Sequence, residues 1–575
     1  MGDQYDRALI RLTTADDDKL EPILAKLLPI VFDELVSQTD APLRAKIVGV
    51  LNHVLTRAKG NKDIKLPTAA IAERWYGPKL GSSPGGLFFR NLSVIFMDLS
   101  IPRLSPLEQA DVAVYALEHF AELQGAADKP PIFMAVIPGL GQIAGEGLRK
   151  EQVQRCLDVI AARPAGDPGL VAFFQAAADF LLIPCGATEA PSVSGMASSS
   201  WSHWKARLKG KTANDMIALK CSVLRWLAAL AAGPPASLVY MPSLCASVEN
   251  YDAVANMADS NCKRLDPELD LSGDLDLLGR LTSAALTSSP PGIEPATSGP
   301  LRVETKASVP AKIRVKVLSM LQRARGIGNP GLVRHVVHLI SQSLRDGEQV
   351  QVAALQLALV LAEHVDPSCL VDTSATVLEE IEAVFWPGGG VLSIGPATPL
   401  AFKTFGSFAR QLAERPSGEG RALAVSRSPH MLALLASNEG AAGDILEALS
   451  GLVACMRGTV EDEYREFVPL LDRLVTSPKP VVRREVLRWA GTLFPTSAPE
   501  GRYYALRLFG DADADIARAA ETLLSGGGRE VPPFADMCGF LAARALSLAT
   551  VPGASGDSVA ERVEAHSVEL AKGST

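Results

Sequence analysis

Patterns that mark common enzyme folds are missing from this sequence. Alternation of apolar and polar residues with a period of two, which marks a half-buried β-strand, is almost absent along its 575 residues. The sequence also contains no Walker loop, no G-x-S-x-G nucleophile elbow and no H-E-x-x-H zinc motif. These absences argue against the enzyme classes that use such motifs and favour a fold built from helices.

Cysteine is scarce and is not arranged in pairs. The eight cysteines include no C-x-x-C pair, and several, such as Cys221 and Cys455, lie inside apolar helical runs. We therefore expect buried, reduced thiols in a cytoplasmic and nuclear protein. The first residues, MGDQYDRALIRLTTADDDKLEP, contain no apolar core of a signal peptide, so no secretory signal is expected.

The sequence has neither a strong net charge nor an obvious membrane span. The 56 Lys and Arg and 64 Asp and Glu residues give a formal net charge of -8, which argues against a nucleic-acid-binding clamp. One segment without a charged residue, Trp226–Val248, contains Pro234, Pro235 and Pro242, which would divide it into two short helices. We expect a soluble hairpin there and no membrane insertion.

One helical signature recurs near opposite ends of the chain. Each copy places apolar residues at i, i+4, i+7, i+8 and i+11 beside an arginine, and follows another apolar run across a tight polar turn. The copies comprise Leu43, Ile47, Val50, Leu51 and Val54, and Val482, Val486, Trp489, Ala490 and Leu493, with further matches from Ile313 and Ile516. A two-helix hairpin with an uncovered apolar face must stack on its neighbours. We therefore predict an all-α fold, an α-solenoid of HEAT/armadillo-like helical hairpins, with Trp489 buried.

The helical segments alternate with segments rich in Gly, Pro and Ser. Helices or hairpins are expected at Lys19–Lys59, Ser105–Leu123, Glu151–Leu182, Ala213–Ala231, Ala246–Leu265, Pro310–Arg323, Pro330–Leu344, Glu348–His364, Ala375–Phe385, Leu400–Glu414, Ala441–Met456, Asp462–Phe494, Tyr503–Phe509 and Asp515–Leu524. Inserted loops are expected at Gly77–Gly86, Cys185–Ser202, Leu286–Ser308, Pro387–Pro399 and Ser525–Gly528. This pattern predicts a first solenoid block at 1–285, a flexible linker at 286–308, a second block at 309–551 and a disordered tail at 552–575.

The most enzyme-like motif lies in the stretch PPIFMAVIPGLGQIA. Gly139, Gly141 and Ala144 match the pattern G-x-G-x-x-A after an apolar run. A dinucleotide site needs a strand, a tight glycine turn that opens into a helix, and an acidic residue at the end of the next strand. Pro138 interrupts the approach, and no strand ending in Asp or Glu follows. We therefore reject a dinucleotide site, and an enzyme using this loop is the least favoured hypothesis.

Two histidines form a further candidate for metal binding. His335 and His338 lie one helical turn apart, and Glu363 and His364 end the next helix. We interpret the histidines as the polar edge of an amphipathic helix, and acidic pairs such as Glu379–Glu380 as a solvated helix face.

Arginines in the repeated signature are also expected to have structural roles. Arg483 and Arg488 should brace the preceding turn rather than bind a partner, and Asp511 and Asp513 should accept hydrogen bonds from the first amides of the last helix. The sequence therefore predicts no catalytic residue, no cofactor-binding residue and no metal ligand. It leaves the partner-binding residues unknown.

An ordered series of segments resembles a known family. The series comprises Arg7, Thr14–Asp16, His53–Lys59, Ile64–Pro67, Arg90–Phe96, Arg103–Leu104, Ala246–Asp252, Cys262–Leu265, Lys312–Leu321, Arg483–Pro495, Arg502–Tyr503, Gly510–Leu524 and Phe534–Cys538. It resembles the proteasome adaptor and scaffold family, very large HEAT-repeat proteins that bind both the core particle and the regulatory cap of the proteasome. Because members are several times longer, the chain corresponds to the N-terminal third or so.

The resemblance implies a function as well as a fold. It implies a non-catalytic scaffold that binds the regulatory-particle ATPases and the core particle, and that modulates proteasome assembly, stability or activity. No cofactor, nucleic acid or small-molecule substrate is implied. The alternative is another HEAT/armadillo adaptor, such as a transport receptor or a vesicle or kinase scaffold.

Overall fold

The computed structural model consists of helices over the residues that it describes. These are residues 2–76, 85–145, 149–187, 193–230, 236–285, 309–387, 395–413, 419–456, 464, 467–526 and 532–549, apart from a few single or paired positions within the ranges. Within this part of the chain, 26 α-helices follow one another with short 3₁₀ turns, and no β-strand occurs. The prediction of an all-α fold is confirmed.

The helices belong to two compact units, Met1–Gly326 and Ile327–Thr575. The first unit contains α1 (Gly2–Thr14), α2 (Asp17–Ser37), α3 (Ala41–Gly60), α4 (Thr68–Trp75), α5 (Gly86–Ser100), α6 (Pro106–His119), α7 (Lys129–Ile143), α8 (Arg149–Ala161), α9 (Pro168–Leu182), α10 (Ser198–Leu208), α11 (Ala213–Leu230), α12 (Ala236–Ala246), α13 (Asp252–Leu265), α14 (Leu275–Ala285) and α15 (Ala311–Leu321). The second contains α16 (Pro330–Leu344), α17 (Glu348–His364), α18 (Ser374–Phe385), α19 (Thr398–Ala413), α20 (Glu419–Ser437), α21 (Ala442–Cys455), α22 (Val468–Val475), α23 (Pro480–Leu493), α24 (Pro499–Leu508), α25 (Ala514–Gly526) and α26 (Phe534–Ala549).

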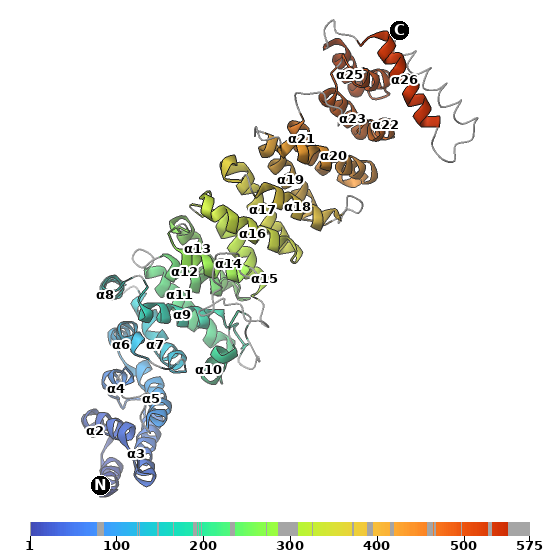
Figure 1. Ribbon diagram of the computed structural model, residues 1–575. Coiled ribbons are helices and arrows are strands. Elements are labelled where there is room, and N and C mark those ends of the chain that lie inside the picture. The colour runs from blue at the N-terminus through green and yellow to red at the C-terminus, as the bar shows by residue number, and fades with distance from the viewer. Residues whose placement is uncertain are drawn as a thin grey trace. The chain divides into compact units, whose positions relative to one another are not determined.

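In helices α1–α8 of the first unit and α19–α26 of the second, successive helices alternate between two layers (Figure 1). In the first unit, α1, α3, α5 and α7 pack on one another in succession, and α2, α4, α6 and α8 form the other layer. In the second unit, α17, α19, α21, α23 and α25 form one layer, while α20, α22, α24 and α26 pack in succession in the other. Consecutive helices such as α6 and α7 or α20 and α21 also pack as hairpins. This two-layer stacking confirms the predicted solenoid.

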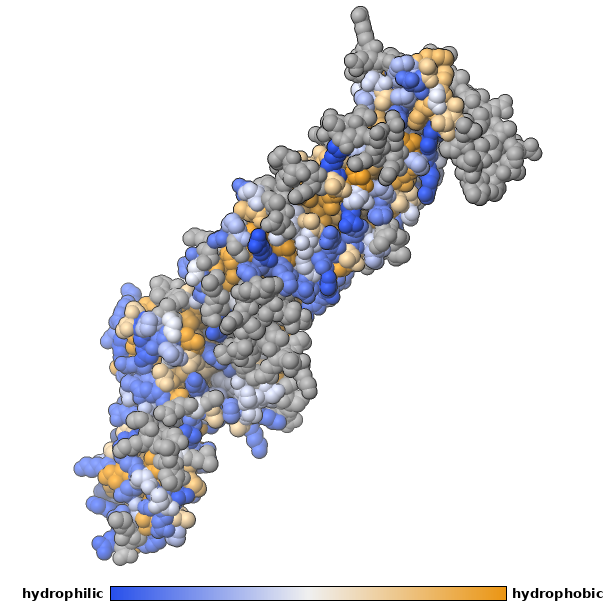
Figure 2. Space-filling model, viewed as in Figure 1, coloured by the Kyte–Doolittle hydropathy of each residue, from blue (hydrophilic) through white to orange (hydrophobic). Residues whose placement is uncertain are grey.

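The predicted apolar stripes form the core between the layers. Trp489 is fully buried, its ring stacks on Phe467 with centroids 5.9 Å apart, and its Nε1 donates to Glu485 Oε1 at 2.8 Å. The predicted burial of Trp489 is therefore confirmed. Leu43 departs from the expected stripe, because it lies in the first turn of α3 and is only half-buried, whereas Ile47 one turn later is fully buried. Hydrophilic side chains cover much of the face seen in Figure 2, with apolar ones exposed between them.

Several helices were not expected from the sequence, namely α1, α4, α5, α7, α10, α14, α20 and α26. Helix α10 begins at Ser198, inside the loop predicted at Cys185–Ser202, and it buries Trp201 and Trp204. Burial of two large rings outweighs the low helix propensity of the Ser-rich sequence, because packing supplies most helical stability in proteins. The edges of three other predicted loops are helical as well, since α5, α19 and α25 extend into them.

The division into units differs from the predicted block boundaries. Helix α15 packs against α12 and α14, and Lys316 forms an ion pair with Asp259 of α13 at 2.5 Å. The compact units therefore divide after α15, between Gly326 and Ile327. The predicted linker at 286–308 and the predicted tail at 552–575 lie outside the described residues, so the domain assignment stays a prediction.

Cysteines and the uncharged segment can also be placed. All eight cysteines are free thiols; Cys156, Cys245 and Cys262 are buried, four are half-buried, and Cys538 is exposed, contrary to the expectation of buried thiols. The described parts of Trp226–Val248 belong to α11 and α12, two separate helices as predicted. Among the described helices, none has the length and apolar character needed to span a membrane.

Cations from later in the chain satisfy helix ends in the first unit. The last four carbonyls of an α-helix have no partner within the helix, and the helix dipole favours positive charge there. Arg57 donates to the carbonyls of Leu12 and Ala15 at the end of α1, at 2.6 and 2.9 Å. Arg103, in a 3₁₀ turn after α5, donates to the carbonyl of Ala58 at the end of α3, at 2.6 Å. These contacts join each helix end to the next repeat.

A buried ion pair holds α11 to the segment that follows α12. The Lys220 ammonium donates to Glu249 Oε2 at 2.7 Å and to the carbonyl of Leu181 at 2.9 Å. The two charged side chains are 1% and 2% exposed, and Glu249 also accepts from the amide of Cys185 at 3.0 Å. Burial raises the pKa of the Glu249 carboxyl, but Lys220 and the amide donors lower it by more, so its pKa lies below the ordinary value.

Arg103→Met should destabilise the first unit by roughly 2–3 kcal/mol, because charged hydrogen bonds to helix-end carbonyls are lost. Besides the carbonyl of Ala58, Arg103 also reaches those of Asn61 and Ile64, at 3.3 and 2.8 Å. The measurement is urea unfolding followed by circular dichroism, with hydrogen exchange read at residues 58–64. Lys62→Met, at an exposed neighbour, is the matched control and should have little effect. Equal stability of the two variants would contradict the role of Arg103.

Glu249→Gln should destabilise the first unit by roughly 3–5 kcal/mol at neutral pH, because the Lys220 ammonium is left buried without its counter-charge. The folded pKa of Glu249 lies below its unfolded value, so its contribution is present above the ordinary carboxyl pKa and is lost as pH falls through the folded pKa. The difference in the free energy of unfolding between wild type and variant, measured with urea, should therefore become smaller under acid conditions. Glu268→Gln, at an exposed acid, is the control. A difference in unfolding free energy that does not change with pH would contradict the proposed stabilisation by the charges of Lys220 and Glu249.

Candidate functional site

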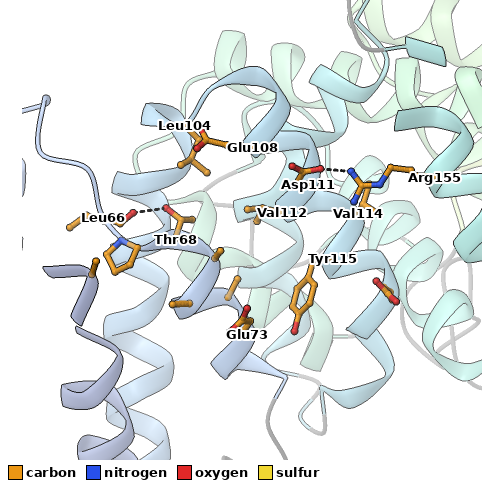
Figure 3. A pocket seen from close by; sticks show the side chains of 16 residues that line it. Leu66, Thr68, Glu73, Leu104, Glu108, Asp111, Val112, Val114, Tyr115 and Arg155 are labelled. Atoms are coloured by element: carbon orange, nitrogen blue, oxygen red, sulfur yellow. Dashed lines mark hydrogen bonds and ion pairs between the residues drawn. The ribbon is translucent and has the colours of Figure 1, made fainter. Parts of the chain in front are cut away.

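A groove of about 650 Å³ lies between α4 and α6 of the first unit (Figure 3). Helix α4 and the residues before it form one wall, and α6 forms the other. Ala25 of α2 and Arg155 of α8 lie at its edges. This volume accommodates a small ligand or several side chains of a bound segment.

The groove combines an apolar floor with an acidic rim. Leu66 and Val112 are buried in the floor, and Leu104 is half-buried. Four carboxylates, from Glu73, Glu108, Asp111 and Glu118, line the groove, against a single lining cation, Arg155. The lining residues come from four helices and from positions 25 to 155, so their proximity is a product of the two-layer stacking.

Two of the four carboxylates already have structural partners. Glu108 Oε2 accepts from the amide and hydroxyl of Ser105, at 2.8 and 2.7 Å, in a capping box that starts α6. These hydrogen bonds lower the pKa of the Glu108 carboxyl. Asp111 forms an ion pair with Arg155, seen as a dashed line in Figure 3. The Ser105–Glu108 spacing is a recognisable sequence signal, but it identifies a helix start rather than a site.

Negative charge also gathers around Tyr115, from Glu73 and from Glu118, whose carboxylate lies 4.0 Å from His119 Nε2. The Tyr115 ring lies against His119, with centroids 4.2 Å apart, and meets the edge of Tyr76 at 5.5 Å. Burial raises the pKa of the Tyr115 phenol, and the carboxylates of Glu73 and Glu118 raise it further. Among the described residues, no cation forms an ion pair with Glu73. This end of the groove is therefore suited to a cationic side chain, through ion pairs and the aromatic face.

The groove contains no evident nucleophile. No cysteine lines it, and burial raises the pKa of the thiols of Cys156 and Cys455 to about 11 and about 12. A search of the described residues finds no group of three or more His, Cys, Asp or Glu side chains placed to hold a metal ion.

The glycine motif lies inside helix α7 and at its end. Gly139 faces α6 so closely that a Cβ atom there would lie 2.1 Å from the carbonyl oxygen of Gln109. Gly141 faces α11, where a Cβ atom would lie 3.0 Å from the side chain of Ser222. These glycines allow helices to pack closely, and Ala144 follows the helix. The stretch forms a helix and not the strand and tight turn that a dinucleotide site requires.

The histidines occupy the positions expected of a helix edge. His335 and His338 are half-buried on α16, and burial, together with the neighbouring His338, lowers the pKa of His335. Glu363 and His364 end α17, where His364 Nδ1 lies 3.3 Å from the carbonyl of Val360.

The arginine of the repeated signature braces the preceding turn, as predicted. Arg483 Nη1 donates to the carbonyl of Ser477, six residues earlier, at 2.8 Å. Arg44 makes the equivalent contact in the first copy, with Nη2 donating to the carbonyl of Gln38 at 3.1 Å. Arg483 also holds Asp511 through two hydrogen bonds of 2.7 and 2.8 Å. Asp511 therefore serves mainly as the partner of Arg483 rather than as a helix cap.

The other predicted polar residues of this region also have structural partners. Arg488 pairs with the buried Glu485 at 2.7 Å. Asp513 Oδ1 accepts from the amides of Asp515 and Ile516 at 3.0 and 3.2 Å, so the cap predicted for α25 is confirmed for this residue.

Comparison with protein families gives one match that covers most of the chain. The family model described as proteasome component ECM29, N-terminal, matches residues 6–507. The proteasome-associated protein ECM29 homolog of Drosophila melanogaster is 26% identical over 271 residues, which is 46% of this chain and 13% of that protein. The proteasome adapter and scaffold protein ECM29 of Homo sapiens is 31% identical over 111 residues, or 19% of this chain and 6% of that protein. The matched regions thus span a small part of these relatives.

Two solved structures of karyopherins are similar at low scores. Kap121p, bound to the extreme C-terminus of the protein phosphatase Cdc14p, gives a TM-score of 0.31 with 10% identity, covering 99% of this chain and 63% of that chain. Kap95p, from a study of its binding to RanGDP, gives a TM-score of 0.29 with 12% identity, covering 100% and 72%.

Gly139→Ala should destabilise the first unit by roughly 2–3 kcal/mol, because the added methyl group would press on the backbone of α6. Thermal unfolding measures the effect. Gly49→Ala is the matched control, since Gly49 lies in α3 with nothing within 4 Å of an added Cβ atom. That change should be neutral or stabilising by up to about 1 kcal/mol through helix propensity. A Gly139→Ala variant as stable as the wild type would contradict the close packing.

Proposed function

This chain belongs to the family of the N-terminal region of the proteasome component ECM29, and from that premise we propose that it is a non-catalytic scaffold that binds the proteasome. The observation that carries the proposal is the family match over residues 6–507. Relatives in this family are named as a proteasome-associated protein and as a proteasome adapter and scaffold protein. Because the matched regions are 13% and 6% of those proteins, the partners of this chain are part of the proposal.

The proposed partners are the regulatory-particle ATPases and the core particle. Binding both would let the chain modulate the assembly, stability or activity of the proteasome, in the cytoplasm and nucleus. A stack of helical repeats supports this function because it presents a long surface. Weak contacts spread over several repeats then raise the effective concentration of two partners relative to each other.

The groove between α4 and α6 supports recognition of a protein surface. Its floor is apolar, and Glu73 and Glu118 supply negative charge beside Tyr115. A basic segment of a partner would complement this charge. The family match favours this function over the alternative of a transport receptor or a vesicle or kinase scaffold.

The test is retention of purified proteasomes by the immobilised 575-residue chain. We expect retention of the intact proteasome, of the isolated regulatory particle and of the isolated core particle, with no ATP or peptide hydrolysis by the chain itself. Glu73→Gln/Glu118→Gln should weaken retention only a few-fold, because contacts are shared over the array. The result is read by quantitative immunoblotting of the retained subunits.

Glu379→Gln/Glu521→Gln, at two exposed acids of the second unit, is the charge-matched control. Failure of the wild-type chain to retain any of the three particles would refute the proposal. Selective retention of nuclear-import cargo in their place would support the transport-receptor alternative.

A further inference from the structure

A second groove, of about 760 Å³, lies between α1 and α2 and has the opposite charge. Three cations, Arg7, Arg11 and Lys26, line it, and no acidic residue is among the described side chains of its lining. All three side chains are exposed, and within the described part of the chain none of them forms an ion pair or a hydrogen bond. The cations therefore add their charges at one site without compensation.

Most of the acids on α1 and α2 whose side chains the structure describes are engaged elsewhere. Asp6 pairs with Lys46 of α3 at 2.6 Å, and Asp33 holds Arg74 of α4 at 2.8 Å. Asp17 pairs with Arg57, and Glu34 accepts a hydrogen bond from the buried Tyr5 hydroxyl. Asp16 is bound to Lys19 at 2.9 Å.

The positive field of the groove thus follows from the internal pairing of the repeat. Of the acidic side chains of α1 and α2 that the structure describes, Glu21 is the one exposed acid without such a partner, and it does not line the groove.

The floor of the groove is an apolar stripe that the fold leaves uncovered. Ile23, Leu27 and Ile30 recur along α2 at helical spacing, and Ile30 is 56% exposed. Ile30 therefore supplies apolar surface inside the groove that a partner could bury, and such burial favours binding. A stripe of this spacing between two helices matches the apolar face of a third helix.

We propose that the groove between α1 and α2 binds an acidic amphipathic segment of a partner protein, whose apolar side chains cover Ile23, Leu27 and Ile30 and whose carboxylates pair with Arg7, Arg11 and Lys26. Charge complementarity selects this occupant, since the described side chains of the lining carry three positive charges and no negative one. Guanidinium groups bind carboxylates bidentately, which orients the segment along the groove. The inference rests on the proposed function in one respect, which is that the partner protein is a subunit of the proteasome.

The test uses the full chain and a defined probe. The probe is a fluorescein-labelled peptide of about 12 residues with Leu at i, i+3, i+4 and i+7 and Glu on the flanking positions. A second peptide has Lys in place of each Glu. Fluorescence anisotropy at low and high salt gives Kd, and we expect the acidic peptide to bind at least about tenfold more tightly at low salt.

Two variants address the two halves of the proposal. Arg7→Gln/Arg11→Gln/Lys26→Gln should weaken acidic-peptide binding by about tenfold or more and remove most of its salt dependence. Ile30→Thr should weaken binding a few-fold without altering the salt dependence. The matched controls are Lys62→Gln/Lys205→Gln/Lys209→Gln, at exposed cations outside the groove, and Ile10→Thr, at an isoleucine that is 64% exposed and does not line it. Both controls should bind as the wild type does, with unchanged thermal unfolding.

Several results would overturn the inference. One is equal binding of the two peptides, and another is equal binding by the triple variant and its control. A third is equally tight binding of a single-stranded oligonucleotide of matched charge, which would show a general anion site. A fourth is a dimer in sedimentation that the triple variant abolishes, which would assign the groove to a second copy of the chain.

Proteasome retention by the same variants separates this inference from the proposed function. If the acidic peptide binds but the chain does not retain proteasomes, the inference about the groove stands and the proposed partner is refuted. If no groove variant changes proteasome retention and the acidic peptide does not bind, the inference about the groove is refuted, but the proposed function is not.

Discussion

The stacking of the first unit depends on how helix-end carbonyls are satisfied. Each helix leaves its last carbonyls without an internal partner, and a thin array of helices offers few neighbours to supply donors. Arg57, Arg103 and Arg163 each donate to a carbonyl 45 residues earlier in the chain, at the end of α1, α3 and α6. A guanidinium serves this position well, because it carries several donors and a charge that the helix dipole favours. One repeat therefore completes the helix ends of the repeat before it.

The sequence predicts the buried face of a helix more reliably than its partners. The stripe around Trp489 could be identified because burial imposes a period of 3.6 residues on the sequence. The carbonyl that accepts the hydrogen bond of Arg103 could not be identified from the sequence, because the contact depends on how one repeat is positioned against the next. Helix α7 was missed since Pro138, Gly139 and Gly141 resemble helix breakers, yet Pro138 lies inside the helix and the glycines let α6 and α11 approach. Helix propensity alone does not predict the structure of a segment whose conformation is determined by packing against other helices.

The candidate groove between α4 and α6 shows that sequence patterns also do not reveal which residues come together in a candidate site. Ser105 and Glu108 form a capping box that could be read from their spacing. Glu73 and Tyr115 come from different helices, and only the stacking of α4 on α6 places them together. No periodicity or motif in the sequence connects them. Sequence reasoning could exclude a dinucleotide site but could not locate a binding surface.

The two grooves of the first unit explain how a mild net charge can conceal strongly charged surfaces. The formal charge of -8 over 575 residues suggests no preference for charged partners. Structural ion pairs, however, remove charges of one sign from a surface and leave the other sign there. On α1 and α2, pairs such as Asp6 with Lys46 and Asp33 with Arg74 use the acids, so the remaining cations face solvent. Between α4 and α6, Asp111 uses the lining cation Arg155, and Glu73 is left without one. In this solenoid, the charges that folding leaves unpaired among the described residues are therefore a better guide to partners than motifs or net charge.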